Sequence, residues 1–111
     1  MKNIEIDTSK ITDWSSFHSY FKTTFGFPDY YGENMDAWID CMTYIDDAES
    51  GMTSKVAIMP GEYAILTLKD VSAFISTHRE LYDALIECSA FVNYRRIESG
   101  QNPVLFLSFF N

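Results

Sequence analysis

The chain has 111 residues, of which 8 are Lys or Arg and 16 are Asp or Glu, so its formal net charge is −8 with both histidines neutral. A composition of 47% apolar and 16% aromatic residues is enough to form a core and argues against intrinsic disorder. The length fits a single domain over residues 1–111 and excludes a large multidomain enzyme. The charge disfavours nucleic acid and anionic membranes, because binding to either needs Lys and Arg near phosphates. We therefore expect a basic protein as partner.

Two cysteines, Cys41 and Cys88, lie in predicted helices without the spacing of zinc ligands or the density of a secreted disulfide scaffold. Cys41 falls on the core side of its helix and is expected to be a buried structural thiol. Residues 1–10 lack the apolar region of a signal peptide, and no run approaches the roughly 18 apolar residues of a membrane span. These features predict a cytoplasmic protein, monomeric when free, with no metal ion or other cofactor.

The first predicted elements are a strand and a helix. Residues 3–6 alternate polar and apolar side chains, which is typical of a strand. Thr12 or Asp13 can cap a helix over about residues 13–25, and Gly26 is suited to end it. Along this helix runs an apolar stripe at spacings of three and four residues, formed by Trp14, Phe17, Phe21 and Phe25. The stripe predicts that the helix packs against a core.

A turn and a second helix come next. Residues 28–32 combine turn-forming residues with Tyr30 and Tyr31, two aromatic side chains that are unfavourable to expose unless they pack or bind. The helix starts at about Glu33 and has two contrasting faces. Its apolar face, which we expect in the core, carries Met35, Trp38, Ile39, Met42 and Ile45. Its other side, called the acidic face below, carries Glu33, Asp36, Asp40, Thr43 and Asp47.

A long connector without a clear pattern follows, over about residues 46–61. It leads into a predicted strand over residues 63–68, because apolar and β-branched residues follow a Pro-Gly turn there. Asp70 then begins a short helix.

The last two elements are a helix and a strand. Thr77 and Glu80 have the spacing of a capping box, which predicts a separate helix that starts at Thr77 and runs toward Gly100. Residues 104–110 are almost entirely apolar, as expected of a strand that is covered on both faces inside a parallel sheet. The order of elements is βααβααβ, which predicts an α/β fold.

The acidic face is the most informative feature of the sequence. Asp36 and Asp40 lie one helical turn apart, and like charges at this spacing destabilise a helix by ~0.2 to 0.5 kcal/mol. The face carries almost no Lys or Arg, and it adjoins Tyr30 and Tyr31. The simplest interpretation is a solvated surface that keeps the protein soluble. Acids beside aromatic residues instead favour a protein interface, and we prefer that interpretation.

A catalytic interpretation would pair Asp36 and Asp40 as acid and base, or combine either with His18 or His78. Nothing in the sequence predicts the cleft that such a site needs. His18 neighbours the apolar stripe of the first helix and is better explained as a packing residue. His78 lies at a helix start, where exposure is ordinary. We therefore do not expect an enzyme.

Residues 27–43, FPDYYGENMDAWIDCMT, resemble the signature of the barstar family of intracellular ribonuclease inhibitors. The order of strands and helices is similar across nearly the whole chain. The resemblance implies a three-stranded parallel sheet with about four packed helices. It also implies a function as inhibitor of a cognate basic ribonuclease, whose active site the protein occludes with carboxylates that stand in for substrate phosphate.

The resemblance also implies roles for individual residues. Asp40 matches the acid that enters the ribonuclease active site, and Asp36 matches a second acid that pairs with cations at the rim. Gly32 and Asn34 match the turn that leads into the helix. The full set of expected partner-binding residues is Tyr30, Tyr31, Gly32, Asn34, Asp36, Ile39, Asp40, Thr43, Tyr44 and Asp47.

The chain departs from the family pattern in two places. Ile39 stands where an interface tryptophan is found, and Tyr44 and Ile45 replace a Gly-Trp pair, so we expect these residues to form an altered rim that sets specificity. Near the expected acid of the last helix, this chain has Arg95 and its neighbours. An alternative function therefore stays open, in which the same scaffold neutralises another basic protein or a toxin that is not a ribonuclease.

Overall fold

A parallel three-stranded sheet organises the protein, as seen in a computed structural model that describes residues 1–111. Its strands lie in the spatial order β1-β2-β3 and are β1 (Lys2–Asp7), β2 (Ala64–Lys69) and β3 (Leu105–Phe110). The register places Ile4 opposite Leu66 and Leu66 opposite Leu107, so β2 is the central strand. Parallel neighbours need long crossover connections, and both crossovers here contain helices.

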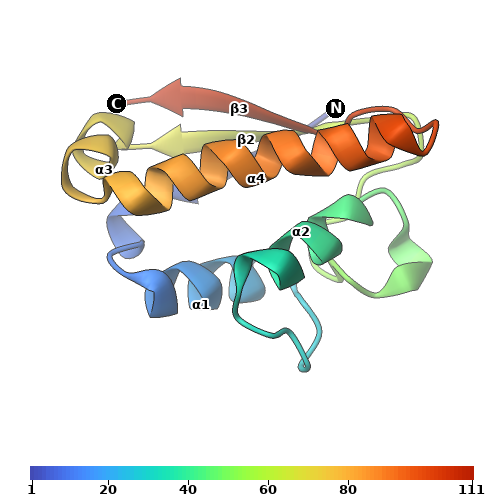
Figure 1. Ribbon diagram of the computed structural model, residues 1–111, viewed down its shortest axis with the longest axis horizontal. Coiled ribbons are helices and arrows are strands. Elements are labelled where there is room, and N and C mark those ends of the chain that lie inside the picture. The colour runs from blue at the N-terminus through green and yellow to red at the C-terminus, as the bar shows by residue number, and fades with distance from the viewer.

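The first crossover contains α1 (Trp14–Phe25) and α2 (Met35–Thr43), and the second contains α3 (Val71–Thr77) and α4 (Arg79–Glu98) (Figure 1). Two short 3-10 helices, η1 (Thr8–Lys10) and η2 (Ala48–Ser50), complete the structure. The α/β class, the three-stranded parallel sheet, the four helices and the order βααβααβ are thereby confirmed.

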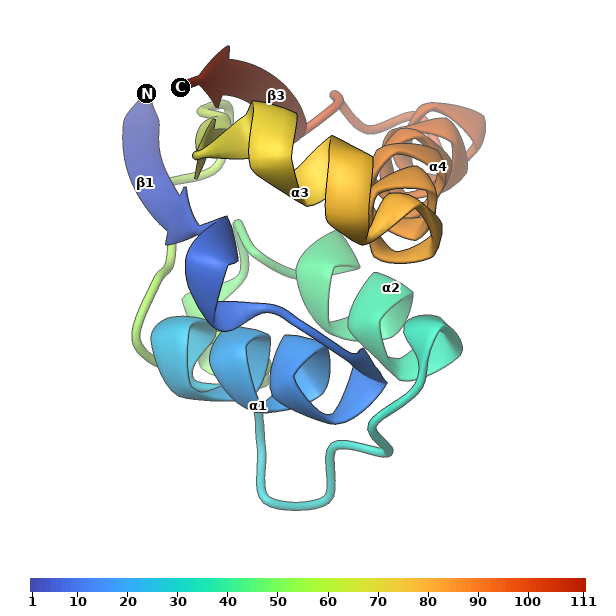
Figure 2. The ribbon, with the colours of Figure 1, turned by 90° about the vertical axis from the view of Figure 1, so that its left-hand side faces the viewer.

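The helices lie on one side of the sheet, with α2 between α1 and α4 (Figure 2). The burial of the strands follows the same division, because Ile4 and Ile6 of β1 are buried whereas Asn3 and Glu5 are exposed. The core between the sheet and the helices includes the expected stripe of α1, and Phe21 packs edge-to-face on Trp38 of α2 with 5.6 Å between ring centroids. The core face of α2 is thus anchored, and its opposite face is left for solvent or a partner.

The ends of α1 follow the sequence expectation. Asp13 caps the helix, because its side chain accepts a hydrogen bond from the Ser16 backbone N–H at 2.7 Å and Ser16 Oγ accepts one from the Asp13 N–H at 3.0 Å. Gly26 ends the helix in the left-handed conformation, with φ +73°. An added Cβ at this position would lie 2.5 Å from Ser54 Oγ, so both the backbone conformation and the space favour glycine.

Cys41 lies in the core with 3% of its surface exposed, and burial raises the pKa of its thiol to about 11. Both cysteines are free. A thiol with a raised pKa is protonated at neutral pH and is a poor nucleophile. The interpretation of Cys41 as a structural residue agrees with this environment.

The prediction that β3 is covered on both faces inside the sheet is wrong. β3 is an edge strand, and Phe106 on its outer face is 43% exposed. Its outward rings are partly covered by neighbours on the same face: Phe106 packs edge-to-face on Tyr63 at 5.1 Å, and Lys69 Nζ lies 4.0 Å from the centroid of the Phe110 ring. An edge strand can therefore carry an apolar run like that of a buried strand, because neighbouring side chains on the same face partly cover its rings.

The predicted capping box of the last helix is also wrong. Thr77 belongs to the last turn of α3, where its hydroxyl donates to the Ala73 carbonyl at 2.7 Å. His78 occupies the N-cap position of α4 without a side-chain capping bond. The two helices are separate, as expected, but the break comes from the backbone at His78 and not from a Thr cap.

The long connector between α2 and β2 packs closely despite its lack of sequence pattern. Val56 and Ile58 are buried, and the Ile58 N–H donates to the Ile45 carbonyl at 3.0 Å. The Lys55 N–H donates to the Phe25 carbonyl at 3.0 Å, which ties the connector to the end of α1. The connector thereby packs against the segment that follows the C-terminal end of α2.

Candidate protein-binding face

The start of α2 is built by Gly32 and Asn34. The Asn34 side chain accepts a hydrogen bond from the Ala37 N–H at 2.8 Å and donates one to the Gly32 carbonyl at 3.2 Å. Asn34 is therefore the N-cap, and the helix begins at Met35, two residues later than the predicted start at Glu33. These contacts give Gly32 and Asn34 a local structural role in setting the direction of α2.

A buried pair of rings joins the turn before α2 to α1. The hydroxyl of Tyr31 lies 2.5 Å from Nδ1 of His18, and these side chains are 6% and 4% exposed. Burial lowers the pKa of His18 against the opposing effect of the Glu33 charge, and burial raises the pKa of Tyr31. With the imidazole neutral, the Tyr31 hydroxyl donates to it. The expectation that His18 is a packing residue is confirmed.

We expect His18 to make the stability of the fold depend on pH. Because its pKa is lower in the folded chain than the ordinary value of 6.5, the unfolded chain binds more protons between those two values. The free energy of unfolding should therefore fall as the pH drops below 6.5 toward the folded pKa. Denaturant titrations between about pH 7.5 and 5 measure this slope.

The matched variants are His18→Gln and His78→Gln. The first removes the buried imidazole and should flatten the slope, whereas the second retains His18 and should keep it. An unchanged slope in His18→Gln would show that another group causes the pH dependence.

The acidic face lies on the surface. Its four carboxylates, all on exposed residues, are those of Glu33, Asp36, Asp40 and Asp47. Thr43 is half-buried, and its hydroxyl donates to the Ile39 carbonyl at 2.6 Å within the helix. Tyr30 is 77% exposed and Tyr44 is 45% exposed, so each places an aromatic ring on the surface. The face therefore combines fixed negative charge with two exposed rings, on a helix whose other side is anchored in the core.

The acidic face carries no Lys or Arg of its own on α2, but a neighbouring helix places cations beside this part of the protein. α4 packs along α2 (Figure 2). It contributes two arginines, Arg95 and Arg96. Arg95 Nη1 donates to Asp40 Oδ1 at 2.9 Å, in a pair whose side chains are 39% and 55% exposed. Arg96 is 4% exposed and forms two hydrogen bonds with the Asp46 carboxylate, at 2.9 and 2.6 Å. The arginines lie about 50 residues along the chain from their partners, so helix periodicity carries no information about them.

Comparison with protein families gives one match. The family model described as Barstar (barnase inhibitor) matches residues 1–108. The chain belongs to the barstar family. A comparison with curated proteins finds no match. Family membership makes this a barnase-inhibitor-like protein, from a family that inhibits and does not catalyse.

This barstar-family protein differs from the expected rim on α2. Ile39 is 7% exposed and Ile45 is fully buried, so neither forms a surface rim. Tyr31, also expected to contact a partner, is buried against His18. The physical reason is the same in each case: these side chains point to the core side of the helix or turn. Of the residues expected to set specificity, Tyr44 alone is exposed.

Sequence reasoning missed several residues that lie on α4 or pair with it. Arg95 and Asp46 were not among the expected site residues, and neither was an exposed aromatic pair on α4, Phe91 and Tyr94, whose ring centroids lie 6.1 Å apart. One signal was available, because two adjacent arginines near the position of an expected acid indicate a changed surface. Their partners depend on how α4 packs against α2.

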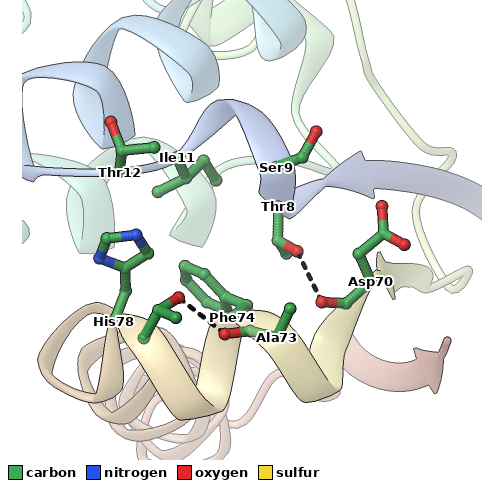
Figure 3. A pocket seen from close by; sticks show the side chains of 9 residues that line it. Thr8, Ser9, Ile11, Thr12, Asp70, Ala73, Phe74 and His78 are labelled. Carbon is green, nitrogen blue, oxygen red and sulfur yellow. Dashed lines mark hydrogen bonds between the residues drawn. The ribbon is translucent and has the colours of Figure 1, made fainter.

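The hollows of this barstar-family protein lie away from Asp36 and Asp40, although Glu33 lines one of them together with Trp14, His18, Asn34 and Met35. Another, of about 280 Å³, opens between η1 and α3, at the ends of β1 and β2 (Figure 3). The Thr8 hydroxyl donates to the Lys69 carbonyl and lies 3.3 Å from the Asp70 carbonyl, and the Thr77 hydroxyl donates to the Ala73 carbonyl. Figure 3 shows the Asp70 and His78 side chains at opposite ends of this hollow.

The residues that the catalytic interpretation combines do not share a cavity. Asp36 and Asp40 line none of the hollows. His18 is bonded to Tyr31 in the core, and His78 lies at the junction of α3 and α4. No helix is both long enough and apolar enough to cross a membrane.

Proposed function

We propose that this protein inhibits a cognate basic ribonuclease by occluding its active site with the acidic face of α2. The observation that carries the proposal is the pair Asp36 and Asp40, two exposed carboxylates one turn apart on a helix whose opposite side is anchored by Trp38 and Met42. A ribonuclease site holds phosphate with His, Arg and Lys. Two rigidly held carboxylates satisfy such a cationic pocket and block it without any chemical step.

The remaining parts of the proposal follow from this mode of action. The protein acts as a single domain of residues 1–111 and as a monomer before it binds. It works in the cytoplasm, as an immunity protein or antitoxin that protects the cell from the enzyme. Tyr30, Tyr44, Thr43 and Asp47 contact the partner around the central acids, because exposed aromatic rings supply buried area and peripheral charges supply orientation.

A second candidate is a basic partner that is not a ribonuclease. Arg95 favours it, because a cation lies beside the central acid near where the family resemblance places an acid. Affinity capture from lysate with the immobilised protein, followed by a ribonuclease assay of the eluate, separates the two candidates. Capture of a basic nuclease whose activity the protein blocks supports inhibition, and capture of a basic protein without nuclease activity supports the alternative.

Association with the captured partner should be fast at low salt and should slow as salt rises. The net charge of −8, with several acids gathered on α2, attracts a basic partner over a distance that dissolved ions shorten. We expect the association rate constant to fall about tenfold or more between ~0.05 and 1 M salt, measured by stopped flow.

Two double variants with the same net charge distinguish the effect of the acidic face on association from the effect of the total charge. Asp36→Asn with Asp40→Asn should flatten the salt dependence much more than Glu49→Gln with Glu80→Gln, whose side chains are exposed elsewhere. Equal slopes in the two variants would mean that α2 does not direct the encounter.

A further inference from the structure

Asp40, the central acid of α2, has only one of its two carboxylate oxygens bonded to another group of the protein. Arg95 donates to Oδ1 of Asp40, and no side-chain or backbone group of the protein donates to Oδ2. Both side chains are partly exposed, at 39% for Arg95 and 55% for Asp40. The adjacent pair of Arg96 and Asp46 is different, because it is largely buried and is joined by two hydrogen bonds. Arg95 therefore has the geometry of a removable counter-ion, and Arg96 that of a structural one.

We propose that Arg95 is an internal counter-ion that competes with external cations for Asp40, so that a partner with several clustered cations displaces it more readily than a single cation does. The identity of that partner rests on the proposed function, whereas the competition itself concerns this chain alone. Arg95 is thus a specificity-determining residue of the inhibitor.

The strength of the exposed pair makes the competition selective. Partly exposed ion pairs change an equilibrium by about two- to fivefold, so a pocket of several arginines or lysines can displace Arg95 from Asp40. A single lysine of an unrelated basic protein gains little by the exchange, because the tethered Arg95 acts at a high effective concentration. A strongly acidic protein would otherwise bind basic proteins without discrimination.

The neighbouring charges fit this role. Asp36 forms no ion pair within the protein, so it stays available to attract a partner while Arg95 engages Asp40. When a partner displaces Arg95, the exposed guanidinium can turn toward solvent without leaving a buried charge. The cost of displacement is therefore small for a multiply charged pocket.

Titration with a hexa-arginine peptide at low salt tests the proposal, with binding followed by NMR at the amide and carboxyl groups of residues 36–40. Arg95→Met should bind the peptide about two- to fivefold more tightly than the unmodified protein, since the competitor is gone. The matched control is Arg79→Met, which removes the same charge from an exposed pair with Asp83 at the other end of α4. It reports the effect of total charge and should give a clearly smaller gain. Thermal unfolding verifies that both variants fold.

The gain of Arg95→Met should disappear when Asp40→Asn is added, because the competition acts through that carboxylate. Arg95→Lys, which keeps the charge, should bind like the unmodified protein. The proposal is overturned if Arg95→Met gains nothing, if Arg79→Met gains as much, or if the gain survives Asp40→Asn. The titration needs no ribonuclease, so its result stands whether or not the capture experiment yields one.

Discussion

Asp40→Ala should weaken binding to the captured partner by ~3 to 5 kcal/mol while leaving the fold intact. The carboxylate is exposed at the centre of the acidic face, so its removal changes no core contact. In the complex, however, the partner's buried cations would lose their counter-charge. Isothermal titration calorimetry measures the affinity, and thermal unfolding measures the fold.

The matched control is Glu49→Ala, which removes one exposed carboxylate from η2 and changes the net charge equally. It should alter the affinity much less, because only its long-range attraction is lost. A comparable loss in both variants would contradict a central role for Asp40 and would reduce the acidic face to a source of general charge.

Arg96→Met should lower the free energy of unfolding by ~3 to 5 kcal/mol, because it leaves Asp46 as a largely buried charge without its partner. Arg96 also donates to the carbonyls of Thr43 at 2.8 Å and Asn102 at 2.7 Å. It therefore joins the end of α2 to the end of α4 and to the loop before β3. Loss of the Arg96 side chain should therefore weaken the packing of α2, which carries the acidic face, against α4. Urea denaturation monitored by tryptophan fluorescence measures the effect.

Arg95→Met is the natural control, since it removes the adjacent arginine from a partly exposed pair and should change the free energy of unfolding by ~0 to 1 kcal/mol. Adding Asp46→Leu to Arg96→Met should recover part of the lost stability, because an apolar side chain removes the unpaired buried charge. Similar small losses from both arginine variants would show that the buried pair does not hold α2 and α4 together.

Much of the fold follows from short-range patterns. The apolar stripe of α1, the Asp13 cap, the Gly26 stop and the two faces of α2 each depend on residues within one or two helical turns, so their spacing predicts them. One failure is also local in origin. Thr77 and Glu80 match a capping box, but the hydroxyl of Thr77 satisfies a carbonyl of its own helix instead.

The candidate site divides in the same way. Helical periodicity alone places Asp36 and Asp40 on the side of α2 opposite Trp38, so the sequence predicts this arrangement. The pairing of Arg95 with Asp40 and the burial of Ile39 and Ile45 depend on how the elements pack in three dimensions. The physical reason is that periodicity specifies which residues share a face, whereas the neighbour of that face depends on how helices distant in the chain pack on the sheet.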